Sequence, residues 1–543
     1  MASMCAFASP VFVSNSSLVR RNIFLNLDAK KNVSCEKRVY SSPHSVLTDV
    51  ATESPIIRRS ASYPPSLWPY ERIQSINSNY TGEKYEARLE TLKDRVRNMI
   101  YKENEKAENP LSTLNLVDDL QRLGIWYHFV DDISNVLDNV YNKYYKSPEK
   151  WNTLDLNLKA LGFRLLRHNG YHITQDTLGM LNLYEASFHS FEDENILDEA
   201  RDFTTKYLQG SIWKISDQYL SLLTSRALDM PLHWRLPRVE SKWFIEAYEK
   251  RSGMNTTVLD LAKLDFNMVQ AVHQEDLKHA SRWWTRTTKW DDKLSFTRDR
   301  LVENYMWALG NSYRPQFTLL RRMLTKELAL VTSVDDIYDV HGTFDELEKF
   351  TDVISRWNIY AIEELPDYMK ICFLGLYNSV NDMAYTTLTD TGLFILPYLQ
   401  KAWEDLCKAY LVEARWYYTK YMPTLKEYLD ISEVSVSVPL MLTHDEMARG
   451  DVPKSIQCYM HETGATEEEA RAHVRSLIIK VWQKLNKERA GLTTTYLKEF
   501  GECAANFGRM AQFMYQVADG HGHNIDLTEA YVLSLVLNPI EGV

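Results

Sequence analysis

The chain has 543 residues and a formal net charge of −11, from 62 Lys and Arg against 73 Asp and Glu. Glycine (19) and proline (17) together make up about 7% of it, against about 12% in average proteins. So few turn formers argue against a β-sandwich or a glycine-rich nucleotide-binding fold and favour long helices. The acidic balance argues against a nucleic-acid partner. No run of 18 apolar residues occurs and the mean hydropathy is −0.36, so we expect no membrane span.

Residues 1–57 have the composition of a transit peptide. They are rich in serine, carry early basic residues and contain no acid before Asp28, and their longest apolar stretch is too short for a secretory signal. We expect import into the plastid stroma. A mitochondrial presequence has a similar composition, and a tail without an address is the plain alternative. The preference for the plastid rests partly on the family resemblance described below.

Helical periodicity dominates from about residue 84 onward, where apolar residues recur at steps of three and four. The stripes are Tyr85, Leu89, Leu92, Val96 and Ile100; Leu116, Leu120, Leu123 and Ile125; and Phe317, Leu320, Leu324, Leu328 and Val331. No sustained alternation of apolar and polar residues is found. The sequence therefore predicts an all-α protein, with a soft boundary at the linker or helix start between Pro231 and Pro237.

The six cysteines give no sign of a metal or disulfide framework. Cys5, Cys35, Cys372, Cys407, Cys458 and Cys503 form no CxxC pair and no zinc-ligand spacing. We therefore predict reduced thiols in a reducing compartment.

The strongest local signal is the acidic run Asp335-Asp336-Ile337-Tyr338-Asp339, which follows the third apolar stripe and so should end a long helix. Residues i and i+4 share a helix face, so Asp335 and Asp339 repel each other unless a cation lies between them. The negative end of the helix dipole favours a cation further, and hard carboxylate ligands suit Mg²⁺. The alternative is a solvated acidic helix end. We interpret the pairs Asp118-Asp119, Asp131-Asp132 and Asp291-Asp292 as surface.

Two arginine motifs accompany the acids. Arg298 and Arg300 lie upstream of Asp335, and guanidinium groups are suited to phosphate oxygens. Because they are two residues apart, their side chains would point in different directions on a helix but not in a loop or at a helix start. The alternative is a solvated basic turn. Arg58 and Arg59 precede Trp68 in a proline-containing segment that can lie across another surface as a strap.

Several catalytic motifs are missing. The sequence has no GxGxxG, GxxxxGK[ST], HExxH or GxSxG, which argues against hydride transfer, P-loop hydrolysis, zinc proteolysis and serine hydrolysis. It also lacks DxDD, the acid motif suited to cyclisation started by protonation.

From Arg58 to the C terminus the chain resembles the angiosperm-type plant monoterpene synthases. The motifs that carry the resemblance are RRx8W, RDR, DDIYD and RGDVPKSIQCYMHETGAT, with LQRLGIWYHF, NLYEASF, PLHWRLPR, LAKLDFN, HGTFDELEKFTD and FMYQVADGHG. The resemblance implies an N-terminal α-barrel domain (58–240) and a C-terminal metal-binding catalytic domain with the class I terpene synthase fold (241–543). It implies a Mg²⁺- or Mn²⁺-dependent carbon–oxygen lyase that acts on geranyl diphosphate. We expect a monomer.

Site residues follow from the same resemblance. The metal ligands are Asp335, Asp336, Asp339 and Glu446; the diphosphate contacts are Arg298, Arg300 and Lys454; the aromatic facing the cation is Trp307; the residues near the mouth are Tyr515 and Asp519; and the capping strap is Arg58, Arg59 and Trp68. An ordinary core role remains open for Trp307 and Tyr515.

The sequence departs from the family at its second metal motif, (N/D)Dxx(S/T)xxxE. Only Glu446 is present; the other positions hold Val438, Pro439 and Leu442, which offer no side-chain ligand. The flanks indicate that a helix is missing there, and a smaller gap is indicated between Asp176 and Thr177. A catalytically impaired splice or gene-model variant is therefore the alternative to an active monoterpene synthase. A sesquiterpene or isoprene synthase is a smaller one.

Overall fold

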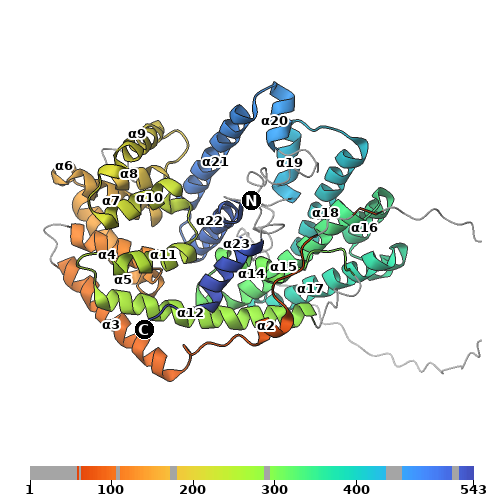
Figure 1. Cartoon of the computed structure of the whole chain (residues 1–543), viewed down its shortest axis with the longest axis horizontal. Coiled ribbons are helices and arrows are strands. Elements are labelled where there is room, and N and C mark those ends of the chain that lie inside the picture. The colour runs from red at the N-terminus through yellow and green to blue at the C-terminus, as the bar shows by residue number, and fades with distance from the viewer. Residues whose placement is uncertain are drawn as a thin grey trace, which may run out of the picture.

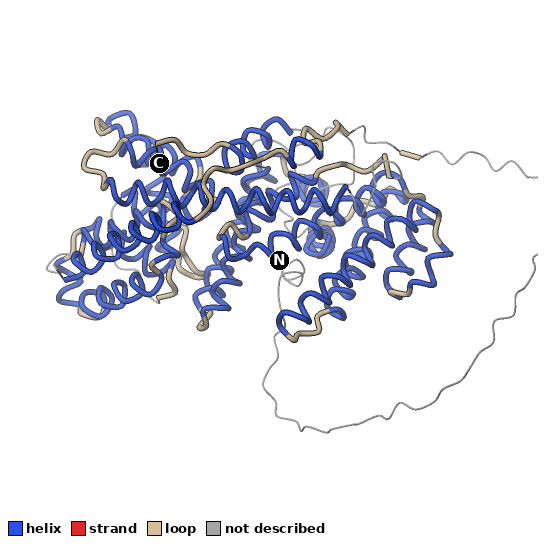
Figure 2. Tube along the Cα trace, turned by 90° about the horizontal axis from the view of Figure 1, so that it is seen from below, coloured by secondary structure: helices blue, strands red, loops and turns tan. Residues whose placement is uncertain are grey.

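The computed structural model describes residues 58–59, 63–105, 110–171, 180–285, 294–435, 455–515 and 525–542. Their regular structure is entirely helical, and these residues include no strand (Figure 2). The prediction of an all-α protein is thus confirmed. Among the same residues, no helix is both long and apolar enough to cross a bilayer.

The helices follow one another in two large groups. The first group is α2 (Tyr70–Gln74), α3 (Glu83–Glu105), α4 (Leu111–Arg122), α5 (Val130–Val140), α6 (Pro148–Thr153), α7 (Leu156–His168), α8 (Met180–Ser187), α9 (Asn195–Ser211), α10 (Gln218–Asp229) and α11 (Pro237–Glu249). The second group is α12 (Thr256–Trp283), α14 (Leu301–Asn311), α15 (Thr318–Asp336), α16 (Phe344–Arg356), α17 (Asp367–Thr391), α18 (Leu396–Thr419), α19 (Leu425–Ser435), α20 (Ser455–Thr463), α21 (Glu467–Ala490), α22 (Thr495–Tyr515) and α23 (Ile525–Val532).

Local sequence signals set many of these boundaries. Asp155, Asp217 and Asn255 cap α7, α10 and α12 by accepting hydrogen bonds from backbone amides of the first turn. A capping box formed by Thr343 and Glu346 begins α16. Pro237 occupies the first turn of α11, where the missing N–H costs nothing. The predicted helix start at this proline is confirmed.

The long helix α12 joins the two groups. It contacts α3, α11, α14 and α15, and Figure 1 shows it running along one side of the molecule between them. Most of its length is buried, and one apolar core reaches from Val96 of α3 through Leu264 of α12 to Met510 of α22. A second core lies among α15, α16, α17 and α18. The end of α15, which carries the acidic run, borders this second core.

The interpretation of Asp118 and Asp119 as surface residues is wrong. Arg164 donates to Asp118 at 2.7 Å, and Nη1 of Arg251 lies 2.9 Å from both oxygens of Asp119. Burial raises the pKa of Asp119 to about 6. The sequence offered one sign that Asp118 is paired. Arg122 follows it by four residues on the same helix and forms an ion pair with it at 3.2 Å.

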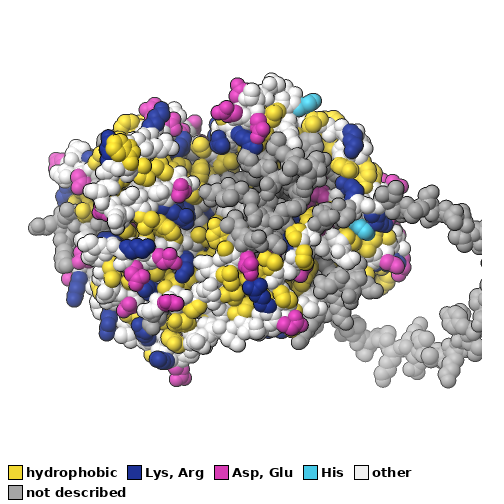
Figure 3. Space-filling view, in the orientation of Figure 1, with side chains coloured by type: hydrophobic (Ala, Val, Ile, Leu, Met, Phe, Trp, Pro, Cys, Tyr) yellow, Lys and Arg dark blue, Asp and Glu magenta, His cyan; other side chains and the backbone are white. Residues whose placement is uncertain are grey.

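The surface and the thiols agree with the composition. On the face seen in Figure 3, basic and acidic side chains are interspersed among the coloured residues, without a large patch of one sign. Cys372, Cys407 and Cys458 are buried, Cys503 is half-buried, and none of the four forms a disulfide among the described residues. Cys5 and Cys35 lie outside the described residues, as does the predicted transit peptide.

Candidate functional site

The acidic run begins at the end of α15 and continues in one π-helical turn, η7 (Ile337–His341). The side chains of Ile337 and Tyr338 are buried in the second core, where the Tyr338 hydroxyl lies 2.7 Å from Oγ1 of Thr351. Asp335 is 27% exposed and Asp339 is exposed. The apolar pair thus anchors the turn, and π turns of this kind are frequent at functional sites.

Arg298 is the cation that neutralises the acids. Its guanidinium forms ion pairs with Asp335 and with Asp336, the latter with Nε 2.9 Å from Oδ1. Its backbone N–H donates to the other oxygen of Asp336 at 2.7 Å. Arg298 therefore forms one charge cluster with Asp335 and Asp336, which follow it by 37 and 38 residues in the sequence.

The electrostatics of this cluster are strongly coupled. Burial opposes the charge on Arg298, but the carboxylates of Asp336 and Asp335 outweigh it and raise the pKa of Arg298 well above its usual value. Burial raises the pKa of Asp336, and the charge of Arg298 offsets only part of that rise. Asp336 is 0% exposed. A buried carboxylate of this kind depends on a positive partner.

Arg300 occupies the position just before α14. Its side chain is fully buried, and Nη2 donates to the carbonyl of Pro64 at 2.9 Å. Arg298 and Arg300 therefore point to different partners. Arg298 also lies over the ring of Tyr63, with its guanidinium carbon 4.9 Å from the centroid. Tyr63 and Pro64 belong to the predicted strap, so both arginines of the RDR motif hold that segment.

The strap begins with Arg58 and Arg59, which contact the second group of helices. Arg58 donates to both carboxylate oxygens of Glu346 at 2.9 Å and to the carbonyl of His341 at 2.8 Å. The guanidinium of Arg59 lies over the ring of Tyr417, 4.2 Å from its centroid. The N-terminal segment, red in Figure 1, therefore passes beside α16 and α18.

Trp68 does not contact the acidic run. It is 3% exposed in the core that α12 shares with the first group of helices, and Arg72 stacks on its ring at 4.1 Å. Trp68 thus anchors one end of the strap while Arg58 holds the other.

Trp307 and Tyr515 lie near each other, on α14 and at the end of α22, with ring centroids 6.1 Å apart. Trp307 is 8% exposed. The structure thus brings these two aromatics together. Glu446, Lys454 and Asp519 lie outside the described residues, as do Val438, Pro439 and Leu442.

Sequence reasoning missed Glu346 and Tyr368. Glu346 receives Arg58, and the hydroxyl of Tyr368 donates to the same carboxylate at 2.9 Å. The only signal for Glu346 was the capping-box spacing from Thr343, which predicts a helix start but not a long-range partner.

Three family models match the chain. Residues 286–445 match "Terpene synthase family, metal binding domain", residues 67–179 and 172–227 match "Terpene synthase, N-terminal domain", and residues 443–484 match "Terpene synthase family 2, C-terminal metal binding". The cluster of Arg298 with Asp335 and Asp336 lies within the first of these.

Similar proteins agree with the models. R-linalool synthase QH5 of Artemisia annua, named chloroplastic, is 51% identical over all of both chains. (−)-α-Terpineol synthase of Vitis vinifera is 45% identical, covering 94% of this chain and 95% of that one. A crystal structure of limonene synthase with 2-fluorolinalyl diphosphate has a TM-score of 0.84 and 39% identity, covering 89% of this chain and all of that one. Isoprene synthase of grey poplar, with three Mg²⁺ ions and a thiolodiphosphate, has a TM-score of 0.78 and 38% identity, covering 88% and 99%.

This chain is shorter than its alignment with the first of these relatives. The alignment with the linalool synthase runs over 603 positions against the 543 residues of this chain, so about 60 positions have no counterpart here. Consecutive family matches meet and overlap at residues 172–179 and 443–445. These are the neighbourhoods of the two gaps that the sequence indicates.

Proposed function

Because the chain belongs to the terpene synthase family, we propose that it ionises geranyl diphosphate and releases a monoterpene and diphosphate. A divalent metal and a small diphosphate substrate are supported by the metal-binding domain and by the ligands of the two solved structures. The choice of geranyl diphosphate is supported by the monoterpene synthases among the relatives. The observation that carries the proposal is the cluster of Arg298, Asp335 and Asp336 inside the metal-binding match.

The residues of the cluster fit Mg²⁺ or Mn²⁺. Asp335 and Asp336 already converge on one positive group, and Asp339 is exposed beside them. Such oxygen ligands suit hard cations. When bound, the metal supplies positive charge that stabilises the departing diphosphate. Glu446 is proposed as a further metal ligand, from its place in the family motif.

The remaining roles are proposed for side chains of this chain. Arg298 presents a fork of donors to phosphate oxygens and is released from Asp335 when substrate binds. Lys454 is a further diphosphate contact. Trp307 is proposed as the aromatic face that excludes water and stabilises an allylic cation, and Tyr515 and Asp519 are proposed as residues near the mouth. The strap of Arg58, Arg59 and Trp68 closes the site, with Arg300 holding its backbone at Pro64.

A specific observation favours a second candidate, a catalytically impaired variant. Val438, Pro439 and Leu442 stand where the family has ligands, and about 60 alignment positions are absent. When the second metal motif contributes only one carboxylate, that of Glu446, the site binds a metal weakly. This candidate predicts that inserting the corresponding segment of the 51% identical linalool synthase at residues 436–446 raises turnover.

The experiment is incubation of the full chain with geranyl diphosphate and Mg²⁺, followed by gas chromatography of the volatiles. A monoterpene supports the proposal. Isoprene from dimethylallyl diphosphate, or a sesquiterpene from farnesyl diphosphate, in its place would overturn the substrate assignment. If no substrate is turned over by the chain but the chimera with the inserted segment is active, the impaired variant is supported.

We also propose a plastid location, supported by the relatives named chloroplastic, and a monomeric state.

A further inference from the structure

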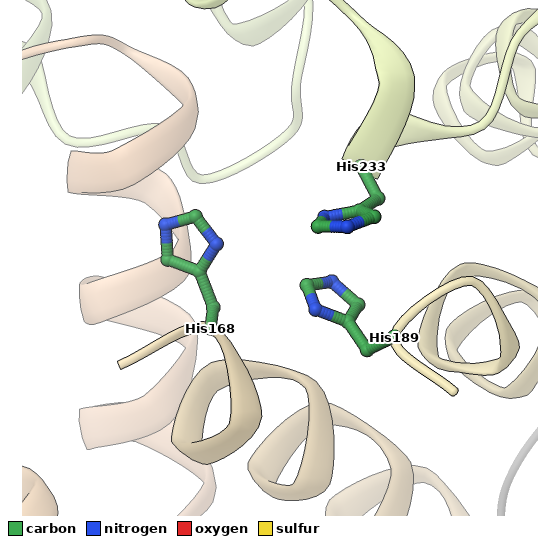
Figure 4. A group of neighbouring side chains, drawn as sticks. All are labelled: His168, His189 and His233. Atoms are coloured by element: carbon green, nitrogen blue, oxygen red, sulfur yellow. The ribbon is translucent and has the colours of Figure 1, made fainter. Parts of the chain in front are cut away.

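Three histidines meet in the first group of helices, far in sequence from the acidic run. His168 ends α7, His189 follows α8, and His233 lies in the short helix η4 (Leu232–Trp234). One ring nitrogen of each lies within 4.8 Å of the other two (Figure 4). In the described residues this is the one group of three or more His, Cys, Asp or Glu side chains with that spacing. Neither the family models nor the proposed reaction uses it.

The hydrogen bonds around His233 determine which of its nitrogens can bind a metal. Asn486 donates its amide N–H groups to the carbonyls of Phe188 and Ser190 at 2.9 and 3.0 Å. Its Oδ1 must therefore accept from Nε2 of His233, at 2.7 Å. A neutral imidazole with its proton on Nε2 has a lone pair on Nδ1. That Nδ1 is buried without a hydrogen-bond partner, in a side chain that is 4% exposed.

This arrangement matches the usual surroundings of a metal-binding histidine. Such a residue donates its second N–H to an oxygen that fixes its tautomer and orientation, and Asn486 supplies that oxygen. His189 is also buried, with 7% of its surface exposed.

There is room for the metal and a further ligand. A cavity of about 100 Å³ is lined by the three histidines together with Glu502, Cys503 and Arg509, among others. Zinc–nitrogen bonds of about 2.0–2.1 Å in a tetrahedron place the nitrogens roughly 3.4 Å apart. The three nitrogens lie within 4.8 Å of one another, so they must close in by at most about 1.4 Å. His189, whose ring centroid lies 3.9 Å from that of His233, is among the residues that line the cavity.

The charges nearby decide which metal fits. Arg489 and Arg509 lie close by, but Glu502 is paired with both, and the charges of these arginines hold its pKa far below the usual range. The cluster contributes no carboxylate of its own, so a hard cation such as Mg²⁺ has little to bind. Imidazole nitrogens suit Zn²⁺. With arginines close by, we expect weaker binding than at a closed cysteine site.

We propose that His168, His189 and His233 form a Zn²⁺ site with water as the fourth ligand, distinct from the acidic site. Its position gives it a structural role. Asn486 and Gln483 of α21 contact the loop between α8 and α9 through the carbonyls of Phe188 and Ser190 and the hydroxyl of Ser190. A metal that fixes His189 and His233 therefore ties this loop and η4 to α21.

The test uses the full chain stripped with a chelator and titrated with ZnSO₄ alone. We expect one equivalent of Zn²⁺ by calorimetry and elemental analysis, a raised midpoint of thermal unfolding, and tetrahedral visible bands when Co²⁺ replaces Zn²⁺. His189→Ala should abolish binding, and so should His168→Gln, at the less buried edge of the cluster. Asn486→Ala should weaken binding by about 10- to 100-fold.

Two matched controls locate the site. His461→Ala removes an exposed histidine of α20, and Asp335→Asn removes a carboxylate of the acidic site; both should bind Zn²⁺ like the unchanged chain. No binding by the unchanged chain overturns the proposal. So does binding that survives in both folded cluster variants, or binding that Asp335→Asn abolishes. Circular dichroism shows which variants are folded.

Discussion

Arg58 and Glu346 form a two-point ion pair although they lie 288 residues apart, with Nη1 and Nη2 each 2.9 Å from a carboxylate oxygen. The same carboxylate accepts the backbone N–H of Thr343 at 3.0 Å and the hydroxyl of Tyr368 at 2.9 Å. One side chain thus joins the strap, the first turn of α16 and α17. Burial alone would raise its pKa, but the bonds from Arg58, Thr343 and Tyr368 lower the pKa of Glu346 to about 2.

Glu346→Gln should release the strap without unfolding α16, because glutamine also serves in a capping box. Loss of a charge-assisted, partly exposed pair should cost about 1 kcal/mol and reduce turnover of geranyl diphosphate about tenfold. Rates of proteolysis near residues 58–68 and product formation are the measurements. The matched control is Glu348→Gln on the same helix, whose partner Arg415 is 3.7 Å away and half-exposed. Equal behaviour of the two variants would contradict the strap assignment.

A matched pair of truncations tests the N-terminal boundary. Removing residues 1–57 keeps Arg58 and Arg59, so turnover in vitro should be unchanged while import into isolated plastids is lost. Removing residues 1–59 deletes the contacts to Glu346 and Tyr417 and should lower turnover as Glu346→Gln does. Import that persists without residues 1–57 would show that the transit peptide is wrongly assigned.

Asp335→Asn should abolish turnover of geranyl diphosphate with Mg²⁺, because it removes a carboxylate at the proposed metal site. Calorimetry with Mg²⁺ alone should show weaker binding, which separates metal loss from a later defect. Asp131→Asn, an exposed acid on α5, is the control and should change neither quantity. Unchanged turnover in Asp335→Asn would refute the metal assignment.

Arg298→Gln should bind Mg²⁺ alone more tightly than the unchanged chain, yet turn over less substrate. The reason is that Arg298 neutralises Asp335 and Asp336, so its removal leaves more negative charge for the metal, while the diphosphate loses a donor. Arg298→Lys keeps the charge but not the fork and should resemble the unchanged chain in Mg²⁺ affinity. If Arg298→Gln binds Mg²⁺ no more tightly, Arg298 does not compete with the metal.

Sequence patterns predicted the features that depend on neighbouring residues. The spacing of Leu92, Val96 and Ile100 predicted the buried face of α3, and the apolar stripe before the acidic run predicted the helix that ends at Asp336. Contacts that depend on tertiary placement were out of reach. Nothing near Glu346 indicates Arg58, and the charges of Asp118 and Asp119 read as surface because their partners Arg164 and Arg251 lie on other elements.

Glu327 in α15 gives the protein a pH-dependent stability. It is 5% exposed, and burial raises its pKa to about 8, with only partial compensation by a hydrogen bond from Trp403 and the charge of Lys326. In the unfolded chain the carboxyl group ionises near its ordinary value of 4.5. Between these two values the unfolded state releases a proton that the folded state keeps. Stability from this group is therefore complete below pH 4.5 and is lost as the pH rises toward 8, by at most ~1.4 kcal/mol per pH unit.

Glu327→Gln removes this dependence while keeping the shape of the neutral side chain. The variant should have nearly the same midpoint of thermal unfolding as the unchanged chain at pH 5 and a higher one at pH 8. Differential scanning calorimetry across that range measures the difference. Glu348→Gln, an exposed glutamate, should not alter the pH profile. A gap between Glu327→Gln and the unchanged chain that is constant with pH would mean that Glu327 is ionised in the folded protein, paired by a cation rather than kept neutral by burial.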